Sequence, residues 1–155
     1  MPRISTKKLA DPLSDKFSLD HSPFYLLAQA QGVYEQRMER SLKAVGMDLP
    51  RWRVLMVVSQ KSPSTISEIA KRAVMKLSTM TKVAQRLAKE GFVQLAANPN
   101  DARSTDVFLT DQGKQAVQRI RVVASRIYNQ ATTDFTKQDL VALNDLLHRL
   151  TENMD

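Results

Sequence analysis

The apolar residues of this chain recur at three- and four-residue spacing almost throughout, and the spacing changes only over residues 92–109. Three- and four-residue spacing places apolar side chains on one face of a helix. The chain has 4 glycines, and three of them, Gly46, Gly91 and Gly113, stand where these patterns end or begin. We therefore predict a mainly α-helical protein with one small β element.

Capping residues and helix-breaking residues divide the chain into six predicted helices. Serine, threonine or proline opens most of them, and these residue types are favoured at the first positions of helices. The predicted helices span residues 22–45; Pro50 to the break at Ser62-Pro63; a short stretch opened by a Thr65–Glu68 capping box; residue 77 or 78 to residue 90; a stretch that starts at Thr110; and one that starts at Thr136, with Asp139 as its capping partner.

Residues 92–109 are rich in valine and phenylalanine and predict two short strands, Phe92–Ala96 and Thr105–Leu109. The polar residues 98–104 between them predict a hairpin with a long tip. A short helix, a turn, a second helix and a hairpin form a winged helix-turn-helix, here at about residues 48–110.

Long helices, about 22–45 and 110–153, flank this module within a single domain of residues 22–155. The winged module is too small to cover the whole apolar face of the helices at either end of the chain. We therefore predict a homodimer in which the terminal helices of two copies cover each other. Residues 1–21 show no sustained period and are predicted to be a flexible arm.

Charge narrows the class of partner. Lys and Arg number 23 against 16 Asp and Glu, a formal net charge of +7, which points to a polyanion such as nucleic acid or anionic lipid. The longest apolar run, residues 54–58, is far too short to span a membrane, and the first twenty residues contain no hydrophobic leader. We therefore expect a cytoplasmic protein.

The residues that most often carry catalysis and metal binding are scarce. With 0 cysteines, thiol catalysis, cysteine redox sensing and zinc ribbons are excluded, and the 2 histidines lie far apart in the sequence. We find no paired carboxylates, nucleophile–base spacing or phosphate-binding glycine loop. The sequence therefore predicts no metal, no cofactor and no enzymatic activity.

The candidate binding element is the helix at 77–90, because the second helix of such a motif enters the major groove of DNA. Met80, Val83, Ala84 and Leu87 are predicted to face the core. The outward set combines short donors, cations and an amide, which suits phosphate anchoring and hydrogen bonding to bases: Ser78, Thr79, Thr81, Lys82, Gln85, Arg86 and Lys89. The alternative is an ordinary solvated helix face.

The hairpin tip supplies a second candidate. Arg103, held out on a rigid loop, suits the narrow minor groove, where negative potential is concentrated. Two residues earlier, the Asp101 carboxylate is placed to brace either the tip or a nearby guanidinium. The alternative is an ordinary turn with an exposed arginine.

Several of these segments together resemble the multiple-antibiotic-resistance regulator (MarR) family of bacterial transcription factors. The wing pattern is the most specific part of the likeness. The segments are Trp52–Leu55, Ile66–Ala70, Ser78–Lys82, Arg86-Leu87, Gly91–Val93, Asn98–Arg103 and Leu109–Gly113.

The resemblance implies a triangular homodimer whose winged domains bind a pseudo-palindromic DNA operator and usually repress transcription. Asp101 and Arg103 match the family's wing motif, and Ser78, Thr79, Thr81, Lys82 and Arg86 match its DNA-contacting helix. Two positions depart from the family, which usually has glycine and a capping aspartate where this chain has Val74 and Lys76. The helix is therefore expected to start slightly late, with Lys76 as an added phosphate contact.

The resemblance also implies release of DNA by a small molecule, often an aromatic or phenolic anion, bound between the dimer helices and the winged domain. Aromatic walls with one cation suit an aromatic carboxylate. The candidates are Phe24, Tyr25, Gln29, Trp52 and Arg53, and the alternative is that each is an ordinary core or surface residue. The competing function for the whole chain is a winged-helix module for protein interaction or dimerisation, without specific DNA binding.

Overall fold

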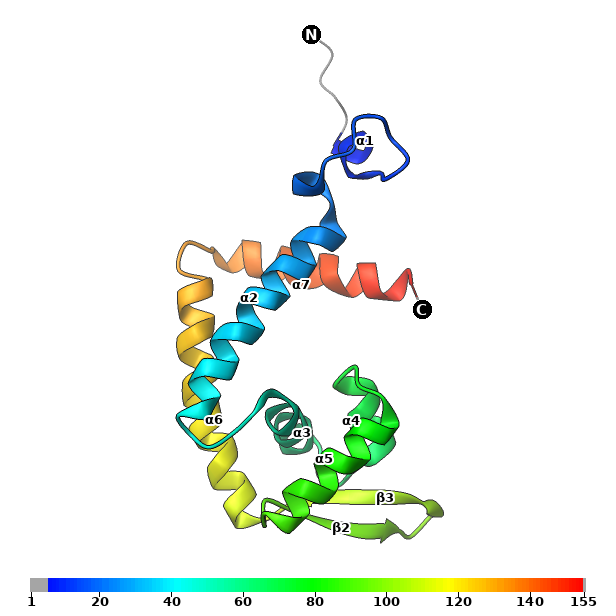
Figure 1. The fold of residues 1–155 in the computed structure, drawn as a ribbon, viewed down its shortest axis with the longest axis vertical. Coiled ribbons are helices and arrows are strands. Elements are labelled where there is room, and N and C mark those ends of the chain that lie inside the picture. The colour runs from blue at the N-terminus through cyan, green and yellow to red at the C-terminus, as the bar shows by residue number, and fades with distance from the viewer. Residues whose placement is uncertain (1–5, 155) are drawn as a thin grey trace.

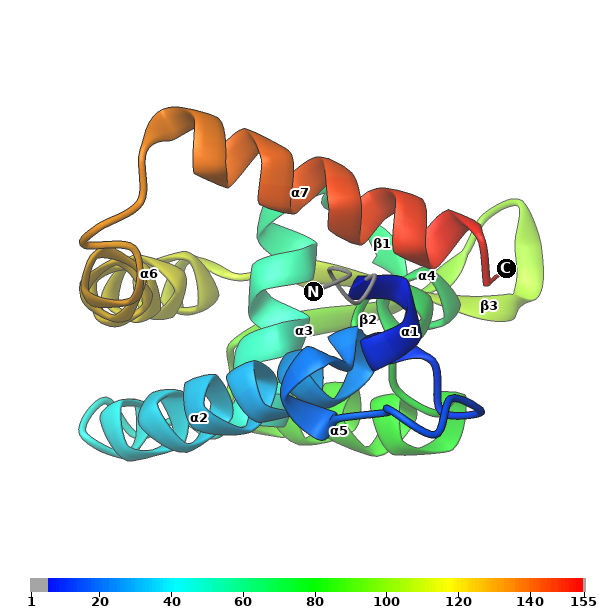
Figure 2. The same cartoon turned by 90° about the horizontal axis from the view of Figure 1, so that it is seen from above.

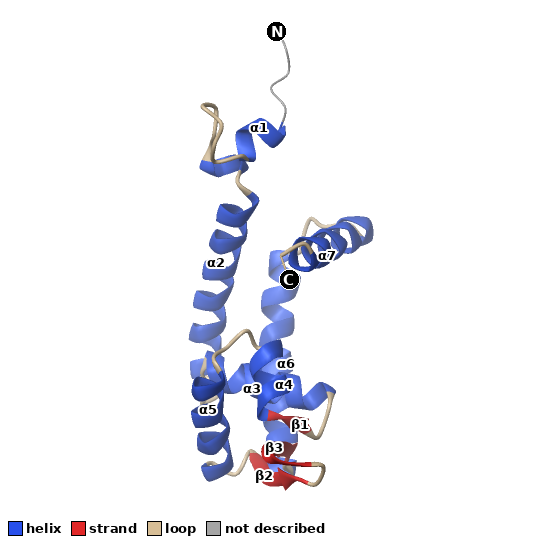
Figure 3. Ribbon diagram, turned by 90° about the vertical axis from the view of Figure 1, so that its right-hand side faces the viewer, coloured by secondary structure: helices blue, strands red, loops and turns tan. Residues whose placement is uncertain are grey.

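The structure, a computed structural model, describes residues 6–154. Helices dominate, and a small antiparallel sheet lies at one end of the molecule (Figures 1 and 3). This confirms the predicted fold class. In chain order the elements are α1 (Thr6–Ala10), the 3-10 helix η1 (Leu19–His21), α2 (Pro23–Lys43), α3 (Leu49–Gln60), β1 (Ser64–Thr65), α4 (Ile66–Arg72), α5 (Leu77–Lys89), β2 (Val93–Asn98), β3 (Asp101–Leu109), α6 (Asp111–Ala131) and α7 (Lys137–Glu152).

The elements form a winged domain and a helical stalk. Helices α3, α4 and α5 pack with the sheet, whose strand order is β1-β3-β2. Helices α2 and α6 pack against each other and lead away from the sheet, and α7 crosses at the far end of α6 (Figure 1). Seen from above, α2 and α7 lie on opposite sides of the molecule (Figure 2).

The local capping signals are confirmed at four predicted helix starts. Side-chain oxygens accept hydrogen bonds from backbone N–H groups at the starts of α2, α4, α6 and α7; the acceptors are Ser22, Thr65, Thr110 and Thr136. Helix α3 starts one residue earlier than Pro50, because the Asp48 carboxylate caps it by accepting from Arg51 N at 3.0 Å. Caps of this kind satisfy backbone donors that have no partner within the helix.

Gly46 and Gly91 follow the ends of α2 and α5 in the left-handed conformation, with φ of +72° and +81°. Glycine adopts this conformation without the steric cost of a Cβ atom. Beyond each glycine the chain bonds back to the helix, Met47 N to Leu42 O and Phe92 N to Leu87 O, both at 2.9 Å. Both predicted helix ends are therefore confirmed.

The core lies between α3, α4, α5, α6 and the sheet. Its fully buried side chains come from every one of these elements and from the C-terminal half of α2. They include Met38, Leu42, Val54, Leu55, Val58, Ile69, Met80, Leu87, Val107 and Ile120. The winged domain is thus packed as a unit with the adjoining ends of α2 and α6.

The hairpin tip expected at residues 98–104 is more ordered than a loop. The regular pairing ends at Ala97 with Thr105, and the register then shifts so that Asn98 pairs with Asp101. Strand β3 therefore begins at Asp101, four residues earlier than predicted, and Pro99 and Asn100 form the turn. Asn98 Oδ1 accepts from the backbone N–H groups of Asn100 and Asp101 at 2.9 and 3.0 Å. Side chains typical of loops therefore stabilise a tight turn here.

Strand β1 was not predicted. It has two residues, which pair antiparallel with β3 as Ser64 with Val107 and Thr65 with Asp106. Two residues are too short to display the alternation that marks a strand in a sequence.

The segment expected to be a flexible arm contains α1 and η1, and neither has a buried residue. Ser18 N donates to Leu9 O at 3.0 Å, so the chain folds back on itself between them. Residues 1–5 lie outside the described range, and the mobility of the arm stays a prediction.

Helix α7 also has no buried residue. Val141, Leu143 and Leu146 on α7 are 52%, 42% and 59% exposed, and at the start of α2 Phe24 and Leu26 are 57% and 45% exposed.

Within residues 6–154 no helix is long and apolar enough to cross a membrane.

Candidate nucleic-acid interface

Helix α5 separates its apolar residues from its polar residues cleanly. Met80, Ala84 and Leu87 are buried, and Val83 packs against them half-buried. The opposite face is exposed at Ser78, Thr79, Lys82, Gln85, Arg86 and Lys89. Thr81 is half-exposed, and its hydroxyl donates to Leu77 O at 2.9 Å. The division into core and outward residues made from the sequence is therefore confirmed.

The turn between α4 and α5 lacks both glycine and a side-chain cap. Val74 adopts φ of +52° and is 90% exposed. Lys76 occupies the capping position of α5 without a side-chain hydrogen bond, and the helix begins at Leu77. Backbone bonds such as Met75 N to Ala70 O at 3.0 Å hold the turn in place. A β-branched residue is thus held in a conformation that favours glycine.

We expect Val74→Gly to stabilise the protein by about 1 kcal/mol, because relief of the left-handed strain exceeds the extra flexibility of glycine in the unfolded chain. Urea denaturation measures this as a higher midpoint at an unchanged slope. Val74→Ala is the control, since it keeps a Cβ atom and most of the strain. An unchanged or lower midpoint for the glycine variant would contradict the strained turn.

The wing hairpin lies beside α5 at the same end of the molecule (Figures 1 and 3). Asp101 Oδ1 accepts from Arg103 N at 3.0 Å, and Oδ2 accepts from Ser104 Oγ at 2.8 Å. These hydrogen bonds hold the pKa of the Asp101 carboxyl below its usual value. The carboxylate therefore braces the backbone of the tip, which is one of the two roles predicted for it.

Several cations of this surface remain free of acidic partners. No ion pair within the described residues involves Lys76, Lys82, Lys89 or Arg103. Arg86 differs, because its guanidinium pairs with Asp48 and Glu90 at 3.3 and 3.0 Å. Glu90 lies one helical turn from Arg86 and was open to prediction from its spacing, whereas Asp48 is 38 residues away in the sequence.

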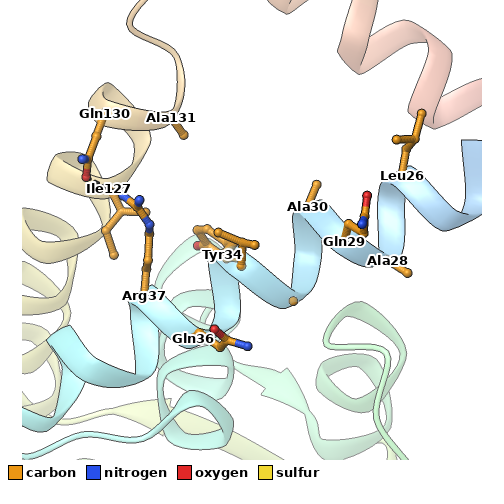
Figure 4. Close-up of a pocket in the computed structure, with 12 residues that line it drawn as sticks. Leu26, Ala28, Gln29, Ala30, Tyr34, Gln36, Arg37, Ile127, Gln130 and Ala131 are labelled. Carbon is orange, nitrogen blue, oxygen red and sulfur yellow. Dashed lines mark hydrogen bonds between the residues drawn. The ribbon is translucent and has the colours of Figure 1, made fainter. Parts of the chain in front are cut away.

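The five residues predicted to bind an effector do not gather in one place. Trp52 and Arg53 line a cavity of about 440 Å³ between α2, α3 and the end of α4. Gln29 lines a different hollow, of about 1010 Å³ between α2 and α6, where Arg37 bonds Gln130 at 2.7 Å (Figure 4). Phe24 and Tyr25 line neither of these cavities.

Helix length explains the separation. Tyr34, which does line the smaller cavity, is nine or ten residues beyond Tyr25 and Phe24. At a rise of about 1.5 Å per residue that is about 14 Å along the helix axis. The lining residues that were not predicted include Tyr34, Glu35 and a second cation, Arg72.

The smaller cavity combines aromatic walls with charged groups. The rings of Tyr34 and Trp52 are 6.2 Å apart at an interplanar angle of 59°. Arg53 pairs with Glu35, whose pKa is lowered chiefly by a hydrogen bond from Gln31 and further by Arg53. Burial raises the pKa of Tyr34, and the positive charge of Arg53 opposes that rise.

Trp52 carries an unused hydrogen-bond donor. Its Nε1 atom is buried and has no partner among the described residues. A buried polar group without a hydrogen bond is uncommon and costly. Trp52 lines the cavity, so its indole N–H is an unsatisfied donor on a residue of the cavity wall.

A helix-turn-helix followed by a hairpin, with a polar and cationic helix face beside an unpaired arginine, defines a winged-helix DNA-binding protein. The MarR family model matches residues 47–105. Over 145 residues the chain is 39% identical to the HTH-type transcriptional repressor IacR of Pseudomonas putida, covering 94% of this chain and 87% of that relative. The protein belongs to the MarR family and is a DNA-binding transcriptional regulator.

Solved structures agree in fold. A MarR family regulator from Silicibacter pomeroyi matches with a TM-score of 0.82 at 22% identity, covering 89% of this chain and 93% of that one. BpsR of Bordetella bronchiseptica, whose DNA binding is regulated by 6-hydroxynicotinic acid, matches with a TM-score of 0.73 at 19% identity, covering 83% and 97%. The competing function, a winged-helix module without specific DNA binding, finds no support.

Proposed function

We propose that two copies of this chain form a homodimeric repressor that binds a pseudo-palindromic operator and is released by a small aromatic anion. The observation that carries the proposal is the exposed polar and cationic face of α5 beside the unpaired Arg103 of the wing. In this arrangement α5 lies in the major groove and Arg103 enters the adjacent minor groove. The protein acts in the cytoplasm by binding, without catalysis.

The proposed contacts of the α5 side chains with DNA are of two kinds, to phosphates and to bases or sugars. Lys76 and Lys82 contact phosphates, and the side chains of Ser78, Thr79, Thr81 and Gln85 contact base edges or sugar-phosphate oxygens. Asp101 keeps the tip rigid so that Arg103 is held outward, as its hydrogen bonds to Arg103 N and Ser104 Oγ support.

The homodimer is supported by the apolar surface that one subunit leaves uncovered. Helix α7 has no buried residue, although leucines recur along it. Exposed apolar residues at the start of α2 lie at the same end of the molecule. Packing of α7 and the start of α2 against a second copy buries both surfaces.

Selection of bound sequences from random duplexes tests the operator. A symmetric dimer predicts an enriched motif of two inverted half-sites about one helical turn, roughly 34–36 Å, apart. A single asymmetric site bound by one subunit contradicts the dimer. Failure to bind any duplex, even at low salt, overturns the proposal.

We expect Arg103→Ala to weaken binding to every duplex and to make the negative slope of log K against log [salt] less steep by about 1, because one phosphate-directed cation is lost. Gel-shift titrations at several salt concentrations measure both quantities. Arg126→Ala is the matched control, since Arg126 is exposed on α6 about 22 Å along the helix from its start near the wing. Equal slopes for wild type and Arg103→Ala would remove Arg103 from the interface.

The proposed effector site is the cavity lined by Tyr34, Trp52 and Arg53. A planar aromatic carboxylate packs against the two tilted rings and pairs with Arg53 in place of Glu35. Regulation of BpsR by 6-hydroxynicotinic acid supports this class of ligand.

Because the chain has 1 tryptophan, its fluorescence reports this cavity directly. Benzoate and 6-hydroxynicotinate are suitable probes, and acetate is the control without a ring. The proposal expects saturable quenching by an aromatic acid, weakened by Arg53→Gln, with release of DNA over the same concentration range. Quenching unaffected by Arg53→Gln would place the ligand elsewhere.

A further inference from the structure

Two arginines and two carboxylates meet at the C-terminal end of α5. The Arg51 guanidinium has an acceptor for each nitrogen. Nε donates to Asp48 Oδ2 at 3.0 Å, Nη1 to Glu90 Oε2 at 2.7 Å, and Nη2 to the Gly46 carbonyl at 3.0 Å. The Arg51 side chain is only 11% exposed, so it is held inside the protein rather than offered to DNA.

These contacts join four helices. Gly46 follows the end of α2, Asp48 caps the start of α3, and Glu90 is the C-terminal capping residue of α5. The carbonyl of Glu90 also accepts from Gln112 Nε2, on the first turn of α6, at 3.2 Å. Arg51 and Glu90 therefore fasten the end of α5 to the rest of the winged domain and to the helix that leads into the stalk.

The start of α5 has no comparable attachment through its capping side chain. Lys76 makes no capping hydrogen bond, and the turn before it contains the strained Val74. The direction of α5 is thus set by the packing of its buried face and by the ion pairs at its C-terminal end.

The same carboxylates hold Arg86, which lies on the exposed face of α5. Arg86 Nε donates to Glu90 Oε1 at 3.0 Å and Nη1 to Asp48 Oδ2 at 3.3 Å, while its side chain remains 57% exposed. No hydrogen bond within the described residues engages Nη2. Arg86 is thereby fixed in place with its Nη2 amino group available to an outside acceptor.

We infer that Arg51 and Glu90 are positioning residues for DNA recognition, which set the direction of α5 in the groove and hold Arg86 against a phosphate. This inference rests on the proposed function. It also makes the loop at the end of α2 part of the DNA-binding apparatus. Burial raises the pKa of Glu90, but hydrogen bonds from Arg51 and Arg86 outweigh it and leave the pKa lowered, so the carboxylate stays ionised at neutral pH.

The direction in which Glu90→Gln changes the affinity for DNA distinguishes a positioning role of Glu90 from a purely electrostatic one. Loss of a carboxylate near DNA strengthens binding to any duplex if only long-range electrostatics matter. If Glu90 positions α5 and Arg86, Glu90→Gln instead weakens specific binding. The two explanations therefore predict opposite changes in affinity for the operator.

The experiment compares the full-length protein on its selected operator and on a scrambled duplex of equal length. We expect Glu90→Gln to bind the operator about tenfold more weakly, with scrambled-duplex binding unchanged or stronger. Arg51→Lys should also lower the ratio of operator affinity to scrambled-duplex affinity. The net charge is unchanged, but an ammonium group cannot serve three acceptors in a planar fork. Asp111→Asn is the control: its carboxylate is 91% exposed on α6, and the ratio should not change.

The outcomes separate the inference from the function on which it rests. If the wild type does not prefer the operator over the scrambled duplex, the proposed function fails. If the wild type prefers it and both variants keep the ratio within about twofold, only the inference fails. Urea midpoints verify that each variant is folded during the assay. Should either variant be unfolded, Arg86→Gln replaces it in the assay, because the Arg86 side chain is mostly exposed. If Arg86 is held against a phosphate, this change weakens operator binding and makes the slope of log K against log [salt] less steep by about 1. An unchanged slope overturns the inference.

Discussion

Gly113→Ala is expected to destabilise the protein by about 3 kcal/mol, because the added methyl group has no room. A Cβ atom at this position would lie 2.0 Å from the carbonyl oxygen of Phe92 and 3.1 Å from Leu109 Cδ2. The carbonyl cannot move freely, since it accepts from Thr110 N at 3.2 Å and from Thr110 Oγ1 at 3.1 Å. Relief of the clash requires the start of α6 to move away from the base of the wing.

Denaturation in urea or by heat measures this loss, and Gly32→Ala is the matched control. Gly32 lies within α2, and a Cβ atom there would meet nothing within 4 Å. Alanine in place of glycine inside a helix is favourable by about 0.8–1.0 kcal/mol. The two glycine-to-alanine changes therefore have opposite expected signs, and a Gly113→Ala protein as stable as the wild type would contradict the close approach of α6 to Phe92.

The double variant Leu143→Glu/Leu146→Glu is expected to convert the proposed dimer into a folded monomer. Two buried charges per subunit oppose association, yet α7 contributes no buried residue to the single chain, so the winged domain should stay folded. Operator affinity should fall by about 10²–10⁴, because the two half-sites are no longer bound by linked modules. Sedimentation and gel-shift titration measure the two effects.

Asn144→Glu is the control for charge on the same helix, because Asn144 is an exposed polar residue between the two leucines. It should leave both the mass and the operator affinity nearly unchanged. If the leucine double variant still sediments as a dimer, the interface lies elsewhere than α7.

The features that could be predicted from the sequence are those that depend on neighbouring residues. Ser22, Thr65, Thr110 and Thr136 cap helices through bonds to backbone groups three residues ahead, so the signal lies within one turn. The two faces of α5 follow from the spacing of its apolar residues. Most of the fold class and the outward set of α5 were accessible for this reason.

The features that were missed depend on contacts between distant segments. The pairing of β1 with β3 joins Thr65 to Asp106, and Arg51 and Arg86 share acidic partners that lie up to 39 residues away. The order within residues 98–104 could not be predicted for a different reason, because Asn98 and Asp101 have side chains that are equally typical of loops and tight turns. Phe24 and Tyr25 were assigned to the effector pocket by residue type alone, without regard to the length of α2.

The braced wing tip has a consequence for the kinetics of DNA binding. Because Asn98 and Asp101 already order the backbone from Asn98 to Ser104, the hairpin arrives at the duplex in its bound shape and loses little conformational entropy there. Substitutions at Asp101 should therefore loosen the tip before contact and slow productive encounter, whereas those at Arg103 should mainly shorten the lifetime of the complex.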